Sequence, residues 1–92
     1  MYYSEYEYDK AEPDFSKVIE IDPNFADAYF YRAMIYYFDK NYDKSVADFS
    51  KAIQINSQYK DAYEFRAKVY RAASKNDSAD ADEKKAKELG DK

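Results

Sequence analysis

The chain has 92 residues, which is enough for one small domain. Its 15 Lys and Arg against 19 Asp and Glu give a formal net charge of −4, so we expect no basic face and no nucleic-acid partner. Cysteine and histidine are both missing, which excludes disulfides, thiolate metal sites and Ser-His or Cys-His nucleophiles.

The apolar segments are short, and none approaches the ~20 residues that span a bilayer. The N-terminal residues do not form a signal sequence either. One glycine and two prolines leave little material for the tight turns of an all-β fold. We therefore expect an all-α protein, without a membrane partner and located in the cytoplasm.

The sequence repeats itself with a period of 34 residues, the spacing from Tyr29 to Tyr63. At this shift Arg32, Ala33 and Tyr36 also fall on identical residues, and residues 14–17 match residues 48–51. The register predicts a partial repeat over residues 1–24 and full repeats over residues 25–58 and 59–92. The chain then holds about two and a half repeats.

The first predicted helix is affected by a proline. Pro13 falls in the register of Ala47, inside a helix, where a proline costs about 3 kcal/mol or more. We therefore expect the helix to begin at Pro13, in its opening turn, and to end near Ile21. Residues 1–3 align with residues 35–37 and are expected to end a helix whose earlier turns are missing.

The middle repeat divides into two helices. Tyr29, Ala33 and Tyr36 recur at i, i+4 and i+7, which predicts a helix over residues 26–38. The same spacing predicts a second helix over residues 42–56, antiparallel to the first across a short turn. Pro23 closes the preceding unit, whereas Ser57 in the same register is expected to weaken the next helix stop.

The last predicted helix covers residues 79–89 and ends at Gly90. Glu83 and Lys87 replace apolar residues of the earlier repeats, and this polar outer face is typical of a terminal capping helix.

Four acidic residues crowd the start of this helix: Asp77, Asp80, Asp82 and Glu83. A calcium loop is one interpretation, but the glycine of its sharp turn and its terminal glutamate are missing. The other interpretation, which we favour, is a helix start capped by Asp77 or Ser78, with acids suited to the helix dipole.

The two-helix pattern resembles the tetratricopeptide repeat (TPR) family. The family's aromatic and small positions are held by Tyr29, Ala33, Tyr36, Ser45, Phe49 and Ala52. The resemblance implies antiparallel helix-turn-helix repeats stacked as a right-handed α-solenoid. It also implies a non-catalytic protein without cofactors, which binds a peptide or helix of a partner protein in a concave groove.

In the family, a second stripe on the first helix of each repeat lines this groove. The corresponding residues are Asp27, Phe30, Tyr31, Met34 and Tyr37 in the middle repeat and Asp61, Glu64, Lys68 and Arg71 in the last. We expect a groove that is aromatic in its middle and charged toward its C-terminal end. The alternative left open is that Phe30, Met34 and Phe38 pack against neighbouring helices.

A second functional hypothesis concerns the N-terminal edge. Phe15, Val18 and Ile19 match residues of the middle repeat that are covered from both sides, while part of their own cover is missing. Two large side chains left bare cost about 1.5–3 kcal/mol each, which favours a homodimer. The self-association edge would comprise Tyr2, Tyr3, Tyr6, Tyr8, Phe15, Val18 and Ile19. Alternatively, residues 1–8 fold back over the edge within one chain.

Overall fold

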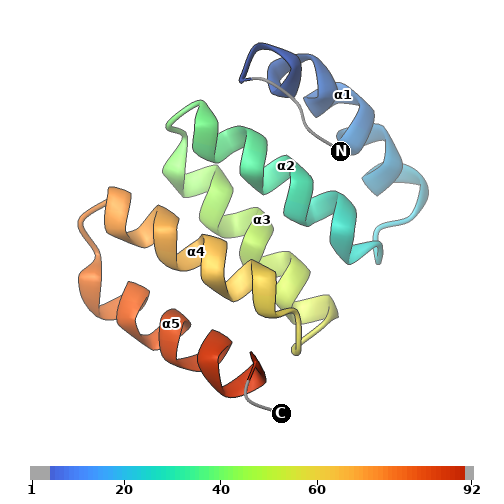
Figure 1. The fold of residues 1–92 in the computed structure, drawn as a ribbon. Coiled ribbons are helices and arrows are strands. Elements are labelled where there is room, and N and C mark those ends of the chain that lie inside the picture. The colour runs from blue at the N-terminus through green and yellow to red at the C-terminus, as the bar shows by residue number, and fades with distance from the viewer. Residues whose placement is uncertain (1–4, 91–92) are drawn as a thin grey trace.

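The protein is an array of helices, each packed against the next (Figure 1). The structure, a computed structural model, describes the backbone of residues 5–90 and the side chains of residues 13–90. Its five helices are α1 Glu5–Ile21, α2 Ala26–Phe38, α3 Tyr42–Ile55, α4 Lys60–Ala72 and α5 Asn76–Gly90. Residues 5–90 contain no strand, so the predicted all-α helical-repeat fold is confirmed.

Successive helices run antiparallel and stack from α1 at one end to α5 at the other (Figure 1). Contacts between the described residues join each helix to the next, and besides these pairs only α2 and α4 touch. Among these described contacts, helix α3 is covered on two sides, by α2 and α4, whereas α1 contacts α2 alone. No helix within residues 5–90 is long and apolar enough to cross a membrane.

The two helical hairpins turn in the same way. After α2, Lys40 adopts φ 62°, and after α4, Ser74 adopts φ 64°. In the first turn, Asn41 N–H donates to the Tyr36 carbonyl at 2.8 Å and Lys40 N–H to that of Tyr37 at 3.0 Å. This is the Schellman arrangement, which satisfies the last carbonyls of a helix with one left-handed residue. The turn predicted between residues 38 and 42 is confirmed.

The links between repeats are also alike, although Ser57 replaces Pro23. Asp22 Oδ1 accepts the backbone N–H of Asn24 at 3.2 Å, and Asn56 Oδ1 accepts that of Gln58 at 3.1 Å. The expected weakening of the stop at Ser57 is not seen, since α3 ends at Ile55. An Asp or Asn side chain that folds back on the backbone makes the turn without a proline.

Small residues let the paired helices approach closely. Ala33 and Ser45 are fully buried, and Ser45 Oγ donates a hydrogen bond of 2.7 Å to the Ala33 carbonyl. The bond satisfies a hydroxyl that would otherwise be buried without a partner. The core around this contact is formed by Tyr29, Phe30, Ala33, Phe49, Ala52, Ala62 and Val69.

An arginine joins three consecutive helices. Arg32 on α2 donates from Nε and Nη2 to the two carboxylate oxygens of Asp48 on α3, at 2.7 and 2.9 Å. Its Nη1 donates to Ser16 Oγ on α1 at 3.1 Å. The planar guanidinium thus holds α1, α2 and α3 in one relative register, because a bidentate pair tolerates little misplacement.

The same arrangement recurs one repeat later. Arg66 on α4 donates to both oxygens of Asp82 on α5 at 2.7 Å, and to Ser50 on α3 at 3.0 Å. The Asp82 hydrogen bond raises the pKa of the Arg66 guanidinium. We call these two arrangements the arginine clamps.

Two predicted helix boundaries are wrong. Helix α1 begins at Glu5, and Pro13 lies inside it rather than in its opening turn. A proline removes one hydrogen bond and displaces one carbonyl, which bends a helix that has full turns on both sides. The end of a preceding helix expected over residues 1–3 lies outside the described residues.

Helix α5 begins at Asn76, earlier than the predicted residue 79, and includes Gly90. The Ala79 N–H already donates to the Lys75 carbonyl at 3.1 Å, so the helix starts directly after the turn at Ser74. Asp77 is therefore in the first turn and is not the cap. Its charge is still favourable there, beside the free N–H groups of the helix start.

The clamp at Arg66 should contribute measurably to stability. Asp82 and Arg66 expose only 7% and 18% of their side chains, so Asp82→Asn should lower the free energy of unfolding by about 2 kcal/mol. Asp80→Asn, on the same helix but 66% exposed, should cost less than about 1 kcal/mol. Urea denaturation of both variants measures the difference, and equal losses would contradict a structural role for the clamp.

Candidate functional site

The residues predicted to line a groove lie on α2 and α4, two helices that contact each other. We call this surface the α2–α4 face. Spacings of three and four residues place Asp27, Met34 and Tyr37 on one stripe of α2, and Asp61, Lys68 and Arg71 occupy the matching register of α4.

The end of the face near the N-termini of α2 and α4 is acidic. Asp27 and Asp61 are exposed there, each in the first turn of its helix. Tyr59, just before α4, donates its hydroxyl to Asp27 Oδ1 at 2.7 Å. Burial, followed by the Asp27 carboxylate, raises the pKa of the Tyr59 phenol, so the hydroxyl remains a donor. Tyr59 was not predicted, although it directly precedes a helix of the repeat.

The structure places Phe30 in the core, which is one of the two alternatives that the sequence left open. It is 7% exposed, and its ring centroid lies 5.5 Å from Phe49, 5.1 Å from Tyr59 and 5.6 Å from Phe65. The ring therefore fills the space between α2, α3 and α4. Phe30 therefore offers almost no accessible surface to a partner peptide.

Other apolar residues of the face remain partly accessible. Tyr31 is 46% exposed, while Met34 and Tyr37 are half-buried and pack against the core. The Tyr37 ring lies 5.6 Å from Phe38, itself half-buried. Tyr31, Met34, Tyr37 and Phe38 thus have one side anchored in the fold and another open to solvent.

The C-terminal part of the face carries two basic residues, of which Arg71 is paired with carboxylates of the same chain and Lys68 is exposed. Arg71 donates from Nε and Nη2 to the Glu83 carboxylate at 2.9 and 2.8 Å, and from Nη2 to Asp80 at 2.7 Å. These hydrogen bonds raise the pKa of Arg71 and lower that of Glu83. Arg71 is therefore neutralised within the chain, whereas Lys68 is exposed with its Nζ 4.6 Å from the Phe65 ring.

Three of the four acidic residues at the start of α5 are paired with arginines. Asp82 holds Arg66, and Asp80 and Glu83 hold Arg71. Within the part of the chain that the structure describes, no three acidic residues converge in a way that could hold a metal ion.

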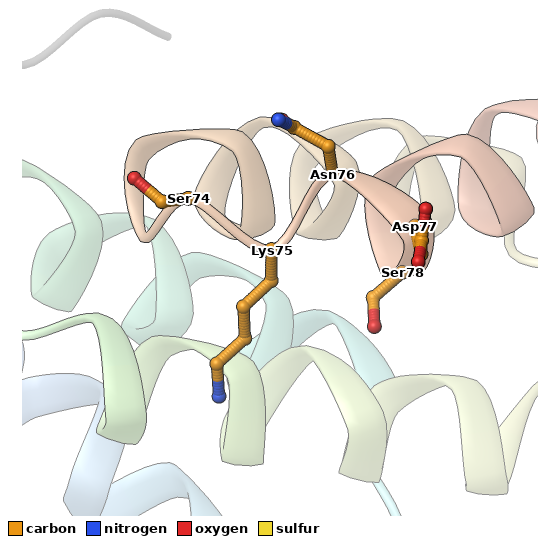
Figure 2. Close-up of a pocket in the computed structure, with 5 residues that line it drawn as sticks. All are labelled: Ser74, Lys75, Asn76, Asp77 and Ser78. Carbon is orange, nitrogen blue, oxygen red and sulfur yellow. The ribbon is translucent and has the colours of Figure 1, made fainter.

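A hollow of about 400 Å³ lies at the turn between α4 and α5, lined by residues 74–78 (Figure 2). The side chains of Lys75 and Asn76 point to opposite sides of the backbone in Figure 2. In a small-molecule site the polar groups converge on the ligand, whereas the side chains of Lys75 and Asn76 diverge. We assign no site to this hollow.

The predicted self-association edge is described only in part. Tyr2 and Tyr3 lie outside the described residues, as do the side chains of Tyr6 and Tyr8. Residues 5–8 form the first turns of α1, so this part does not fold back over the helix.

The described residues of the edge are Phe15, Val18 and Ile19, and all three are half-buried. The Phe15 ring stacks on Tyr31 of α2 at 5.5 Å. In the same register of α3, Phe49 and Ala52 are fully buried. Self-association through this edge stays a prediction.

Comparison with known proteins agrees with this architecture. A family model described as tetratricopeptide repeat matches residues 26–59, and a second model with the same description matches residues 1–25. A crystal structure of MamA has a TM-score of 0.88 and 26% sequence identity over 92% of this chain. MamA from Desulfovibrio magneticus RS-1 has a TM-score of 0.87 and 20% identity over 91% of the chain.

The chain spans about half the length of these MamA chains, 50% of the first and 48% of the second. No match was found among curated proteins.

Substitutions on α2 should separate core residues from surface residues. Phe30→Ala should lower the free energy of unfolding by about 3–5 kcal/mol, because it empties a buried aromatic site. Tyr31→Ala, at a position 46% exposed, should cost only about 1 kcal/mol. Urea denaturation followed by circular dichroism makes the comparison. Similar losses of unfolding free energy for both variants would contradict the assignment of Phe30 to the core and of Tyr31 to the surface.

Proposed function

Because the chain belongs to the tetratricopeptide repeat family, a family of protein-interaction repeats, we propose that its α2–α4 face binds a peptide or helix of a partner protein without catalysis. The observation that carries the proposal is the set of apolar side chains that are anchored in the fold yet open to solvent. Tyr31, Met34 and Tyr37 offer contact area whose conformational freedom is already restricted by packing, so binding has less entropy to lose.

The charges along the face specify the partner's chemistry. Asp27, Asp61 and Glu64 place negative charge toward the N-terminal ends of α2 and α4. Asp27 accepts a hydrogen bond from Tyr59, and Glu64 makes an exposed ion pair of 3.5 Å with Lys60. An exposed ion pair of this kind is weak, so the Glu64 carboxylate is available to a ligand. A segment with two or three apolar side chains followed by Lys or Arg is complementary to this arrangement.

The contacts of the strongest carboxylate–arginine pairs support a non-catalytic role. Asp48, Asp82 and Glu83 are bound bidentately by arginines that join neighbouring helices. These carboxylates hold the repeats together and are not directed at a shared cavity.

Selection of peptides from a random display library tests the proposal. The enriched sequences should combine aromatic or aliphatic residues with a basic residue. Fluorescence anisotropy then measures the affinity of one such peptide for the protein and its variants. Asp61→Lys should weaken binding at least tenfold, because it reverses a charge that faces the basic residue of the ligand.

Asp43→Lys is the matched control for this experiment. Asp43 is also an exposed acid in the first turn of a helix, but it lies on α3 rather than on α2 or α4. It should retain the wild-type affinity and the wild-type circular dichroism spectrum. Equal weakening by both variants would indicate non-specific attraction by net charge and would contradict the assignment of the face.

A further inference from the structure

Tyr59 makes a hydrogen bond that its own turn does not need. The residue lies in the link between α3 and α4, in the register of Phe25 in the link between α1 and α2. The backbone N–H of Phe25 donates to the Asp22 carbonyl at 3.1 Å, and that of Tyr59 donates to the Asn56 carbonyl at 3.1 Å. The two links make the same turn, with a hydroxyl in one and without it in the other. The hydroxyl of Tyr59 is therefore available for another role.

This hydroxyl is directed at the α2–α4 face. It donates to Asp27 Oδ1 on α2 at 2.7 Å, although the two residues lie 32 positions apart in the sequence. The Tyr59 ring is stacked on Phe30, with ring centroids 5.1 Å apart, and Phe30 is only 7% exposed. A ring packed on the core thus holds a carboxylate that is itself exposed at the surface.

Two carboxylates act on the hydroxyl. Burial raises the pKa of the Tyr59 phenol most, followed by the hydrogen bond and the charge of Asp27, and Asp61 adds a weaker contribution. Asp27 and Asp61 each lie in the first turn of a helix, where a negative charge is favourable in any rotamer of the side chain. The stability of α2 therefore does not require that Asp27 be held in one orientation.

The hydrogen bond uses only part of the acceptor capacity of Asp27. A carboxylate offers about four lone-pair sites on its two oxygens. Among the described residues, Tyr59 is the only side chain that donates to Asp27, and it uses Oδ1 alone. The second oxygen can accept a charge-assisted hydrogen bond from a ligand without displacing the hydroxyl. Because the side chain is already held, binding has less conformational entropy to lose.

We propose that Tyr59 is a positioning residue of the α2–α4 face, which holds the Asp27 carboxylate in the orientation that receives a basic side chain of the partner segment. This role rests on the proposed function of the face and names the residue on which its preference for a basic partner depends. Tyr31 lies four residues after Asp27 on the same stripe of α2 and is 46% exposed, so its ring can contact the same cation.

The orientation of Asp27 can be measured without a ligand. Three-bond NMR couplings across its Cα–Cβ bond should show one χ1 rotamer in the wild-type protein and an average over several rotamers in Tyr59→Phe. This variant keeps the ring on Phe30 and should keep the wild-type circular dichroism spectrum. Tyr63→Phe is the matched control, because it removes a hydroxyl that donates at 3.2 Å to a backbone carbonyl of the same link, that of Ser57. It should leave the Asp27 couplings unchanged.

Two peptides test the effect on recognition. The first is acetyl-Leu-Phe-Leu-Arg amide, and the second carries citrulline in place of arginine, which keeps the shape of the side chain and removes its charge. In titrations followed by amide chemical shifts, the wild-type protein should prefer the arginine peptide about fivefold or more. Tyr59→Phe should weaken the arginine peptide about threefold and leave the citrulline peptide unchanged, whereas Tyr63→Phe should affect neither. In an Asp27→Asn background, Tyr59→Phe should have no further effect on the arginine peptide.

Four results would contradict the positioning role. An unchanged Asp27 rotamer in Tyr59→Phe is the first, and equal weakening of both peptides, which a merely structural role would produce, is the second. The third is tighter binding of the arginine peptide by Tyr59→Phe, because the hydroxyl would then compete with the ligand. The fourth is the absence of binding by the arginine peptide. If Asp61→Lys weakens this peptide and Tyr59→Phe does not, the positioning role fails alone. If no peptide responds to Asp61→Lys, the proposed function fails with it.

Discussion

Each arginine clamp imposes one geometric condition on three helices. The guanidinium of Arg32 has to meet a carboxylate on α3 and a hydroxyl on α1 at the same time. A translation of one helix by a single residue, about 1.5 Å, would break a bidentate pair of this kind. Apolar packing alone tolerates such slips more easily, because contacts between aliphatic groups have little directionality. The clamps therefore define the register in which the apolar faces meet.

The clamps also explain why charged groups can lie so deep in a small fold. Arg66 is surrounded by two aromatic rings, with its guanidinium carbon 5.7 Å from the centroids of both Tyr63 and Tyr70. Its donors are directed to Asp82 and Ser50, and no described side-chain nitrogen or oxygen is buried without a hydrogen bond. The desolvation of a buried ion pair is offset only when its remaining donors are satisfied in this way. The polar network and the aromatic packing are thus one structural unit.

Much of this architecture could be predicted from the 34-residue period. The bounds of α2 coincide with the predicted residues 26–38, because an aromatic-small-aromatic stripe is a strong helical signal. The predicted start of α1 is wrong because the helical turns on either side of Pro13 outweigh its local penalty. The burial of Phe30 was ambiguous for a related reason. Helix α2 packs against α1, α3 and α4, so more than one stripe of it is covered.

The clamps themselves were missed, although a signal for them is present in the sequence. Arg32 lies 16 residues after Ser16 and 16 residues before Asp48, and the same two spacings relate Arg66 to Ser50 and Asp82. Hydrophobic periodicity does not detect such a pattern, because the residues are polar and lie on three different helices. Recurrence of a charged pair at a fixed separation in successive repeats is what would have revealed it.

The two ends of the array differ in the chemistry that they present. At α5, Glu83 takes the position held by Phe49 in α3, and it binds Arg71 of the same chain. The pair leaves a charged, solvated surface at a position where α3 has a buried aromatic ring. At α1, the corresponding position keeps the aromatic Phe15, and the clamp position keeps Asp14. The described helices at the two ends therefore differ by one substitution: a carboxylate paired within the chain at α5, and an aromatic ring stacked on Tyr31 at α1.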